Sequence, residues 1–161
     1  MSISPPRLEA DFQEGAIKLA KEVIGAIGEA GVFCVEMFLN SKNEILVNEI
    51  APRPHNSGHH SIDAFSISQY ESQVRALVGL PILMPDFLNA SVLLNILGEE
   101  AEILNSSAHQ FELYSSSAVR LYMYGKQSVR PRRKMGHVMF VGSSVESLIR
   151  EAEATLESIK A

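Results

Sequence analysis

The sequence has no tryptophan, a single cysteine, and no apolar run approaching the roughly 20 residues that cross a bilayer. The lone Cys34 excludes an intramolecular disulfide, and its place in the apolar run Val32–Val35 favours a buried thiol in a reducing compartment. A basic excess is also missing: the net charge of -5 argues against a nucleic-acid-binding surface. Residues 1–7 lack the apolar core of a signal peptide. We therefore expect a cytoplasmic protein without membrane or nucleic-acid partners.

The first half of the sequence carries helical and strand patterns in turn. Apolar residues at helical spacing predict a helix that runs to Ile27 and ends at Gly28. Two runs rich in β-branched residues, Val32–Leu39 and Ile45–Ala51, predict a hairpin. A further helix is expected over about Ile62–Val78, where Gly79 follows.

The second half begins near Pro85, where the composition changes, so we expect two lobes, residues 1–84 and 85–161. Strands are predicted at Ser91–Leu97, Val119–Tyr124 and His137–Val141. A capping box from Ser143 to Glu146 precedes a C-terminal helix. Together these elements predict an α/β (α+β) fold: antiparallel strands backed by helices, followed by a small antiparallel-sheet lobe.

Two glutamates of the predicted hairpin, Glu36 and Glu49, form an informative pair. If the turn is Ser41–Glu44, Asn40 pairs with Ile45, and this register sets the two glutamates opposite each other. Facing like charges destabilise a sheet, and a magnesium ion held by both carboxylates would supply a reason for them. A shifted register, with one glutamate in solvent or beside a lysine, is the alternative that spacing leaves open.

A polar loop, Arg53–His60, follows the second strand and holds a guanidinium, an amide, a hydroxyl, a glycine and three imidazoles. Such a donor set suits a small oxyanion. A solvated turn is the alternative, as is a zinc site, although His55, His59 and His60 lack a cysteine or carboxylate at a regular ligand spacing.

A basic cluster stands out in the second half of this acidic chain. Within nine positions lie five of the 14 basic residues: Lys126, Arg130, Arg132, Arg133 and Lys134. A basic loop between two strands suits a phosphate group, and a solvated run of charges is the alternative.

Four sequence blocks together resemble one enzyme family. They are Gly31–Phe38, Val47–His59, Tyr122–Lys126 and Arg133–His137. They closely resemble the signatures of the N5-carboxyaminoimidazole ribonucleotide synthetases, ATP-grasp carbon–nitrogen ligases of purine biosynthesis. The resemblance covers about residues 2–160 and corresponds to the C-terminal half of that family.

The resemblance implies a fold and a set of site residues. Residues 1–84 would be the C-terminal subdomain of an ATP-grasp domain, and residues 85–161 the family's small sheet lobe. Glu36 and Glu49 would hold magnesium, with Asn48 and Glu49 in the nucleotide site. The substrate contacts implied by the family are Arg53, His55, Asn56, Ser57, Lys126 and Arg133.

Two of these residues would be catalytic: Arg53 would orient the carboxyl group and His55 would manage a proton. Lys126 and Arg133, seven positions apart, would hold the ribonucleotide 5′-phosphate. His59 and His60 are expected to support the loop.

The implied reaction uses ATP and Mg²⁺ to activate bicarbonate as carboxyphosphate, which then carboxylates 5-aminoimidazole ribonucleotide. The family's N-terminal nucleotide-fold domain and first ATP-grasp subdomain have no counterpart in this sequence. We therefore expect the chain alone to be inactive, to need that half or a partner chain, and to form a homodimer through exposed apolar surface.

Two alternatives remain open from the sequence. One is another ATP-grasp purine ligase, such as the formate-dependent glycinamide ribonucleotide transformylase, against which the run Arg53–His59 argues. The other is a non-catalytic nucleotide-binding or interaction module that needs a partner chain.

Overall fold

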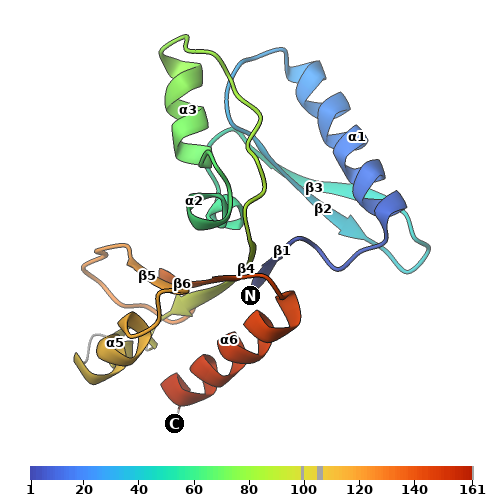
Figure 1. Cartoon of the computed structure of the whole chain (residues 1–161). Coiled ribbons are helices and arrows are strands. Elements are labelled where there is room, and N and C mark those ends of the chain that lie inside the picture. The colour runs from blue at the N-terminus through green and yellow to red at the C-terminus, as the bar shows by residue number, and fades with distance from the viewer. Residues whose placement is uncertain (99, 105–106, 161) are drawn as a thin grey trace. The chain divides into compact units, whose positions relative to one another are not determined.

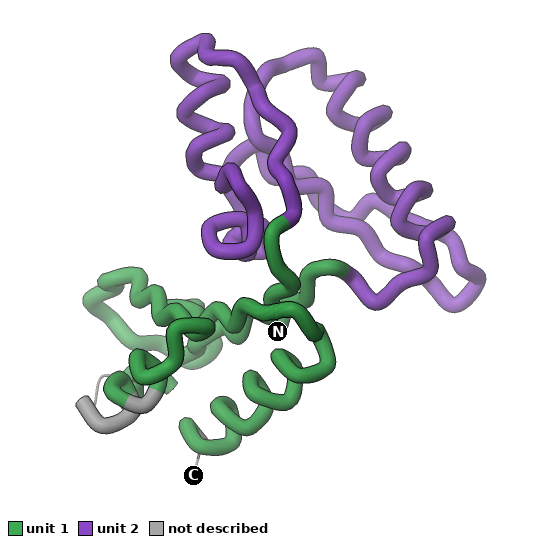
Figure 2. Tube along the Cα trace, viewed as in Figure 1, with its two compact units in different colours: residues 1–5, 88–161 green, residues 6–87 purple. Residues whose placement is uncertain are grey.

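The computed structural model describes residues 1–98, 100–104 and 107–160. It divides into two compact units, residues 6–87 and residues 1–5 with 88–161 (Figure 2). The two lobes expected from the sequence, residues 1–84 and 85–161, differ from these units chiefly in the placement of residues 1–5. Their assignment as separate domains remains a prediction.

Residues 6–87 begin with helix α1 (Ala10–Ile27), which is followed by the antiparallel strands β2 (Cys34–Leu39) and β3 (Ile45–Ala51) (Figure 1). The helix ends as predicted at Gly28, whose φ of 72° is left-handed and whose N–H donates to the Ile24 carbonyl. A glycine accepts this conformation without the Cβ clash that other residues meet.

The hairpin turn is built around one asparagine side chain. Asn40 Oδ1 accepts from the backbone N–H groups of Lys42 and Glu44, at 2.9 and 3.0 Å. Asn43 takes a φ of 62°, which asparagine tolerates better than most residues. Contacts within the turn itself therefore stabilise the hairpin.

The single helix expected over Ile62–Val78 is wrong, because the segment forms α2 (Ser61–Ala64) and α3 (Gln69–Leu77). Phe65 is extended between them and forms a β-bridge with Phe87. The Ser68 side chain then caps α3 by accepting the N–H of Glu71 at 3.1 Å. A tertiary bridge and a new N-cap thus override the helical periodicity.

The second unit is built on a four-stranded antiparallel sheet in the order β1-β4-β6-β5. Its strands are β1 (Ser2–Ser4), β4 (Ala90–Leu97), β5 (Val119–Met123) and β6 (Lys134–Gly142). Its helices are α4 (Glu100–Leu104), α5 (Ser107–Tyr114) and α6 (Val145–Lys160). The mixed helical and antiparallel fold class expected from the sequence is confirmed.

The core of this unit lies between one face of the sheet and these helices. Alternate residues of β4 point to that face, and they are Ala90, Val92, Leu94 and Ile96. They pack with buried helix residues such as Leu104, Leu148, Ala152 and Ile159. Each fully buried leucine or isoleucine contributes about 1.5–3 kcal/mol, so this face holds the unit together.

Helix α6 begins one residue later than the expected capping box requires. The helix starts at Val145, and Ser144 Oγ accepts the N–H of Ser147 at 3.4 Å. Ser144 is therefore the N-cap rather than Ser143, and its hydroxyl also lies 3.2 Å from a Glu146 carboxylate oxygen. Among the described residues, no helix has the length and apolar character needed to cross a membrane.

Candidate functional site

Glu36 and Glu49 lie directly opposite each other in the β2–β3 hairpin. Near the turn, however, Ile45 pairs with Leu39 and not with Asn40 as expected. A bulge between Glu36 and the next residue shifts the register by one and restores the predicted glutamate pair. The alternative of a slipped pairing is therefore excluded at these two residues.

Asn48 is the extra residue of this bulge, since its neighbours pair with Glu36 and Met37. Its amide nitrogen lies 3.5 Å from a Glu36 carboxylate oxygen. Bulges are common beside active sites because they redirect side chains. Two carboxylates and an amide therefore come from three adjoining positions of the hairpin.

The backbone of His55 is held by one side chain from the start of α3. Gln69 Oε1 accepts the His55 N–H at 2.9 Å, and Gln69 Nε2 donates to the His55 carbonyl at 2.9 Å. A Cβ at Gly58 would lie 2.4 Å from Gln69 Oε1, so glycine is needed for this approach. Sequence reasoning missed Gln69, because nothing in its local pattern marks a residue that acts on a loop 14 positions away.

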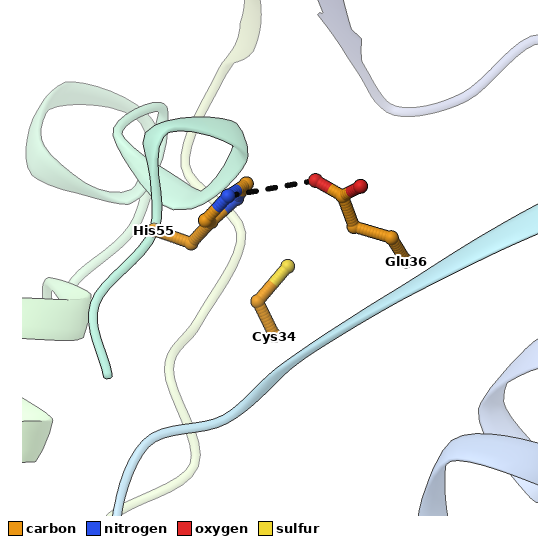
Figure 3. A group of neighbouring side chains, drawn as sticks. All are labelled: Cys34, Glu36 and His55. Atoms are coloured by element: carbon orange, nitrogen blue, oxygen red, sulfur yellow. Dashed lines mark ion pairs between the residues drawn. The ribbon is translucent and has the colours of Figure 1, made fainter. Parts of the chain in front are cut away.

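The His55 ring lies between a hydroxyl and a carboxylate. Its Nδ1 is 2.9 Å from Ser57 Oγ, and its Nε2 is 3.5 Å from Glu36 Oε1. Cys34 Sγ lies 3.3 Å from the same Ser57 oxygen. Figure 3 shows His55 and Glu36 directed toward one another, with the thiol of Cys34 beside them. The thiol is partly exposed, which corrects the expectation that it is buried.

The other two histidines of the loop turn to structural contacts. His59 is buried, stacks on Tyr70, and has its Nδ1 3.1 Å from the Tyr70 hydroxyl. His60 Nδ1 lies 2.7 Å from the Ser57 carbonyl oxygen, and burial lowers the pKa of this imidazole. These contacts agree with the expectation that His59 and His60 support the loop.

Arg53 and Asn56 are placed differently from His55. Arg53 is exposed and donates to the neighbouring Pro54 carbonyl at 3.1 Å. Asn56 begins the short 3-10 helix η1 (Asn56–Gly58). Contacts of Arg53 and Asn56 with a substrate stay predictions.

A pocket of about 450 Å³ adjoins the His55 loop. Its lining includes Cys34, His55 and Ser57 together with the aromatic rings of Phe33 and Phe65. The side chains of Cys34 and His55, both of types that bind metal ions, thus border a space that a small molecule or water can enter.

The basic loop of the other unit is organised around two cations. Arg133 donates through Nη1 to the Ser128 carbonyl and to Ser128 Oγ, at 2.9 and 2.6 Å. Lys126 donates to the Lys134 carbonyl and lies 5.3 Å from the centroid of the Tyr124 ring. Both predicted phosphate-binding side chains are therefore held by their own loop.

Comparison with known proteins finds matches for both parts of the chain. An ATP-grasp domain model matches residues 1–70, and a model of the phosphoribosylaminoimidazole carboxylase C-terminal domain matches residues 91–151. The N5-carboxyaminoimidazole ribonucleotide synthase of Bacillus subtilis is 39% identical over 93% of this chain. The synthetase structure from Thermotoga maritima is 37% identical, with a TM-score of 0.84 over 98% of this chain. Over nearly its whole length, this chain is similar to the C-terminal part of N5-carboxyaminoimidazole ribonucleotide synthetases.

The chain spans less than half of these synthetases. It covers 38% of the Bacillus subtilis protein and 44% of the Thermotoga maritima chain. An Aspergillus clavatus synthase solved with ADP and 5-aminoimidazole ribonucleotide has a TM-score of 0.84 at 28% identity, and 43% of it is covered. These matches support the synthetase over the transformylase that the sequence had left open.

The residues expected to form the synthetase site fall into two groups. The first, in residues 6–87, brings together Glu36, Asn48, Glu49, His55 and Ser57. The second is the loop with Lys126 and Arg133 in the other unit. Their roles in binding and catalysis remain predictions that the similarity to the synthetases motivates.

Proposed function

We propose that this chain contributes the C-terminal part of an ATP- and bicarbonate-dependent ligase that carboxylates 5-aminoimidazole ribonucleotide in the cytoplasm. The observation that carries the proposal is the Glu36–Glu49 pair with Asn48 beside it, in a chain that matches the synthetase family. Because the chain spans under half of its relatives, the complete activity would require the segments that they carry beyond it.

The donor chemistry of the hairpin fits magnesium. Glu36, Glu49 and Asn48 offer carboxylate and amide oxygens, which are the ligands that a hard cation prefers. When bound with ATP, the ion would neutralise phosphate charge. The facing carboxylates would thereby lose the repulsion that they exert on each other.

The loop residues would act on the reacting groups. Arg53 would orient the carboxyl group, and His55 would hold a proton at the ring nitrogen that faces Glu36. Ser57 fixes the orientation of that ring through its 2.9 Å contact with Nδ1. Lys126 and Arg133 would anchor the 5′-phosphate through charge-assisted hydrogen bonds.

Reconstitution tests this function. The chain would be mixed with an N-terminal half of a related synthetase, and phosphate release from ATP would be measured with and without 5-aminoimidazole ribonucleotide. We expect release that depends on the ribonucleotide and on bicarbonate, and that Glu36→Gln abolishes. Glu44→Gln, in the hairpin turn, is the matched control and should retain activity. Nucleotide binding without any release by a folded mixture would instead favour the non-catalytic module.

A further inference from the structure

Cys34, Glu36 and His55 form a donor set that magnesium binding does not explain. One ligand atom from each side chain lies within 4.8 Å of the other two (Figure 3). Magnesium is held by oxygen ligands, whereas thiolate and imidazole ligands favour zinc and similar transition metals. We propose that these three side chains form a binding site for a zinc-type divalent ion.

The geometry of the three ligands is close to what such an ion requires. Cys34 and Glu36 are two positions apart in β2, so their side chains lie on the same face of the strand. Ligands around tetrahedral zinc are separated by about 3.3–3.6 Å, given metal–ligand distances near 2.0–2.3 Å. The 3.5 Å between His55 Nε2 and Glu36 Oε1 already meets this spacing. Because the three ligand atoms lie within 4.8 Å of one another, small side-chain movements complete a three-ligand site.

Ser57 and Gln69 give this site a supporting shell. Ser57 Oγ contacts both His55 Nδ1, at 2.9 Å, and Cys34 Sγ, at 3.3 Å. It thereby leaves Nε2 as the nitrogen that faces Glu36. Gln69 fixes the His55 backbone through both of its amide atoms. Metal-binding histidines characteristically donate the second ring N–H to a neighbouring oxygen, and in the metal-bound tautomer His55 Nδ1 would donate to Ser57 Oγ in place of accepting the Ser57 N–H.

The neighbouring pocket supplies the remaining coordination position. Cys34, His55 and Ser57 all line the space of about 450 Å³. The His55 side chain is 16% exposed and that of Glu36 is 39% exposed, so an ion can reach both ligands. Three protein ligands with one open position describe a site that holds water or a solute as its fourth ligand.

This site shares Glu36 with the proposed magnesium site and His55 with the proposed proton transfer. A bound zinc-type ion would withdraw both residues from those roles and would therefore inhibit the reconstituted enzyme. That consequence rests on the proposed function. Binding of the ion does not, because it depends only on the three ligands.

Cobalt(II) provides a direct test, since it occupies zinc-type sites and absorbs light. A sulfur-to-cobalt charge-transfer band in the near ultraviolet can arise only from Cys34, the one cysteine of the chain. We expect a saturable band at one ion per chain that added Zn²⁺ removes. Cys34→Ala should abolish it, and His55→Ala and Glu36→Gln should each weaken binding by at least about tenfold.

Glu49→Gln is the matched control, because Glu49 faces Glu36 but lies outside the ligand group. It should leave the cobalt affinity unchanged while it lowers ribonucleotide-dependent phosphate release, so failures of the two proposals can be distinguished. Circular dichroism would verify that each variant folds. The absence of a band in the folded chain would overturn the metal site. An unchanged cobalt affinity in both His55→Ala and Glu36→Gln would also overturn it. This comparison remains valid even if Cys34→Ala does not fold.

Discussion

Two like charges face each other across the β2–β3 hairpin, at Glu36 and Glu49. In the absence of metal we expect Glu49→Gln to leave the free energy of unfolding unchanged or to raise it by up to about 1 kcal/mol, because it removes this repulsion. Urea denaturation in the presence of a chelator measures the change. Glu44→Gln is the control and should not stabilise, since the Glu44 carboxylate accepts from Asn40 at 2.7 Å. A clear loss of stability in Glu49→Gln would mean that the carboxylate makes a favourable contact.

Two arginines of the basic loop should differ in their effect on ligand binding. Arg133 is oriented by its bonds to Ser128, and the family resemblance assigns it the phosphate. We expect Arg133→Ala to weaken binding of 5-aminoimidazole ribonucleotide by about 1.5–3 kcal/mol, the range for a hydrogen bond to a charged group. Arg130→Ala should have a much smaller effect. Calorimetry on both variants measures this, and equal losses would indicate a diffuse basic patch.

Single residues of the site were predictable from the sequence to different degrees. The Glu36–Glu49 pair was predicted from strand spacing. The expected pairing of Asn40 with Ile45 was wrong, however, and the two glutamates face each other only because the bulge at Asn48 shifts the register by one residue. A bulge adds a residue to one strand without a local sequence signal, so spacing alone does not reveal it. Gln69 was not predictable, because its role depends on the tertiary approach of α3 to the His55 loop.

Among the elements, helix α6 offers a test of its observed start. Ser144 accepts the N–H of Ser147, as an N-cap does, and Ser143 lies outside the helix. We expect Ser144→Ala to lower the free energy of unfolding by about 1 kcal/mol, within the range of N-cap substitutions. Ser143→Ala is the matched control and should change it by less than about 0.5 kcal/mol. Thermal or urea unfolding measures the stability of both variants. A larger loss in Ser143→Ala than in Ser144→Ala would support the capping box predicted from the sequence.

Elements with strong local signals were predictable, whereas those set by tertiary contacts were not. The α1 helix, its glycine stop and the β2–β3 hairpin follow from periodicity and turn residues. The break between α2 and α3 depends on the Phe65–Phe87 bridge, which joins residues far apart in sequence. Strand β1 is three residues long, too short for a pattern to appear.

At the scale of the whole molecule, large apolar side chains are exposed in residues 77–84. Leu77 is 75% exposed and Met84 is 89% exposed. We expect the chain to self-associate reversibly through this stretch, because exposed apolar clusters tend to find a partner. Sedimentation velocity should show an average mass that rises with concentration toward a dimer.

Charged substitutions locate the contact. Ile82→Lys and Met84→Lys should each weaken association by at least about tenfold in Kd, which corresponds to about 1.4 kcal/mol. Ser41→Lys adds the same charge in the hairpin turn and should have little effect. A monomer at all concentrations would contradict the expected association. Equal effects of all three variants would mean that the added charge, and not its position, weakens association.

The pairing of β1 with β4 has a consequence for the order in which the chain acquires its structure. Ser2–Ser4 pair with residues 91–93, so residues 6–87 form an insertion within one sheet. During synthesis the inserted unit emerges complete before the partner strand of β1 exists. When this unit folds, it limits the distance between its two ends. The entropy cost of pairing β1 with β4 then falls, because the connecting segment is no longer a long flexible loop. Until that happens, β4 has an open edge whose free N–H and C=O groups can pair with another nascent chain.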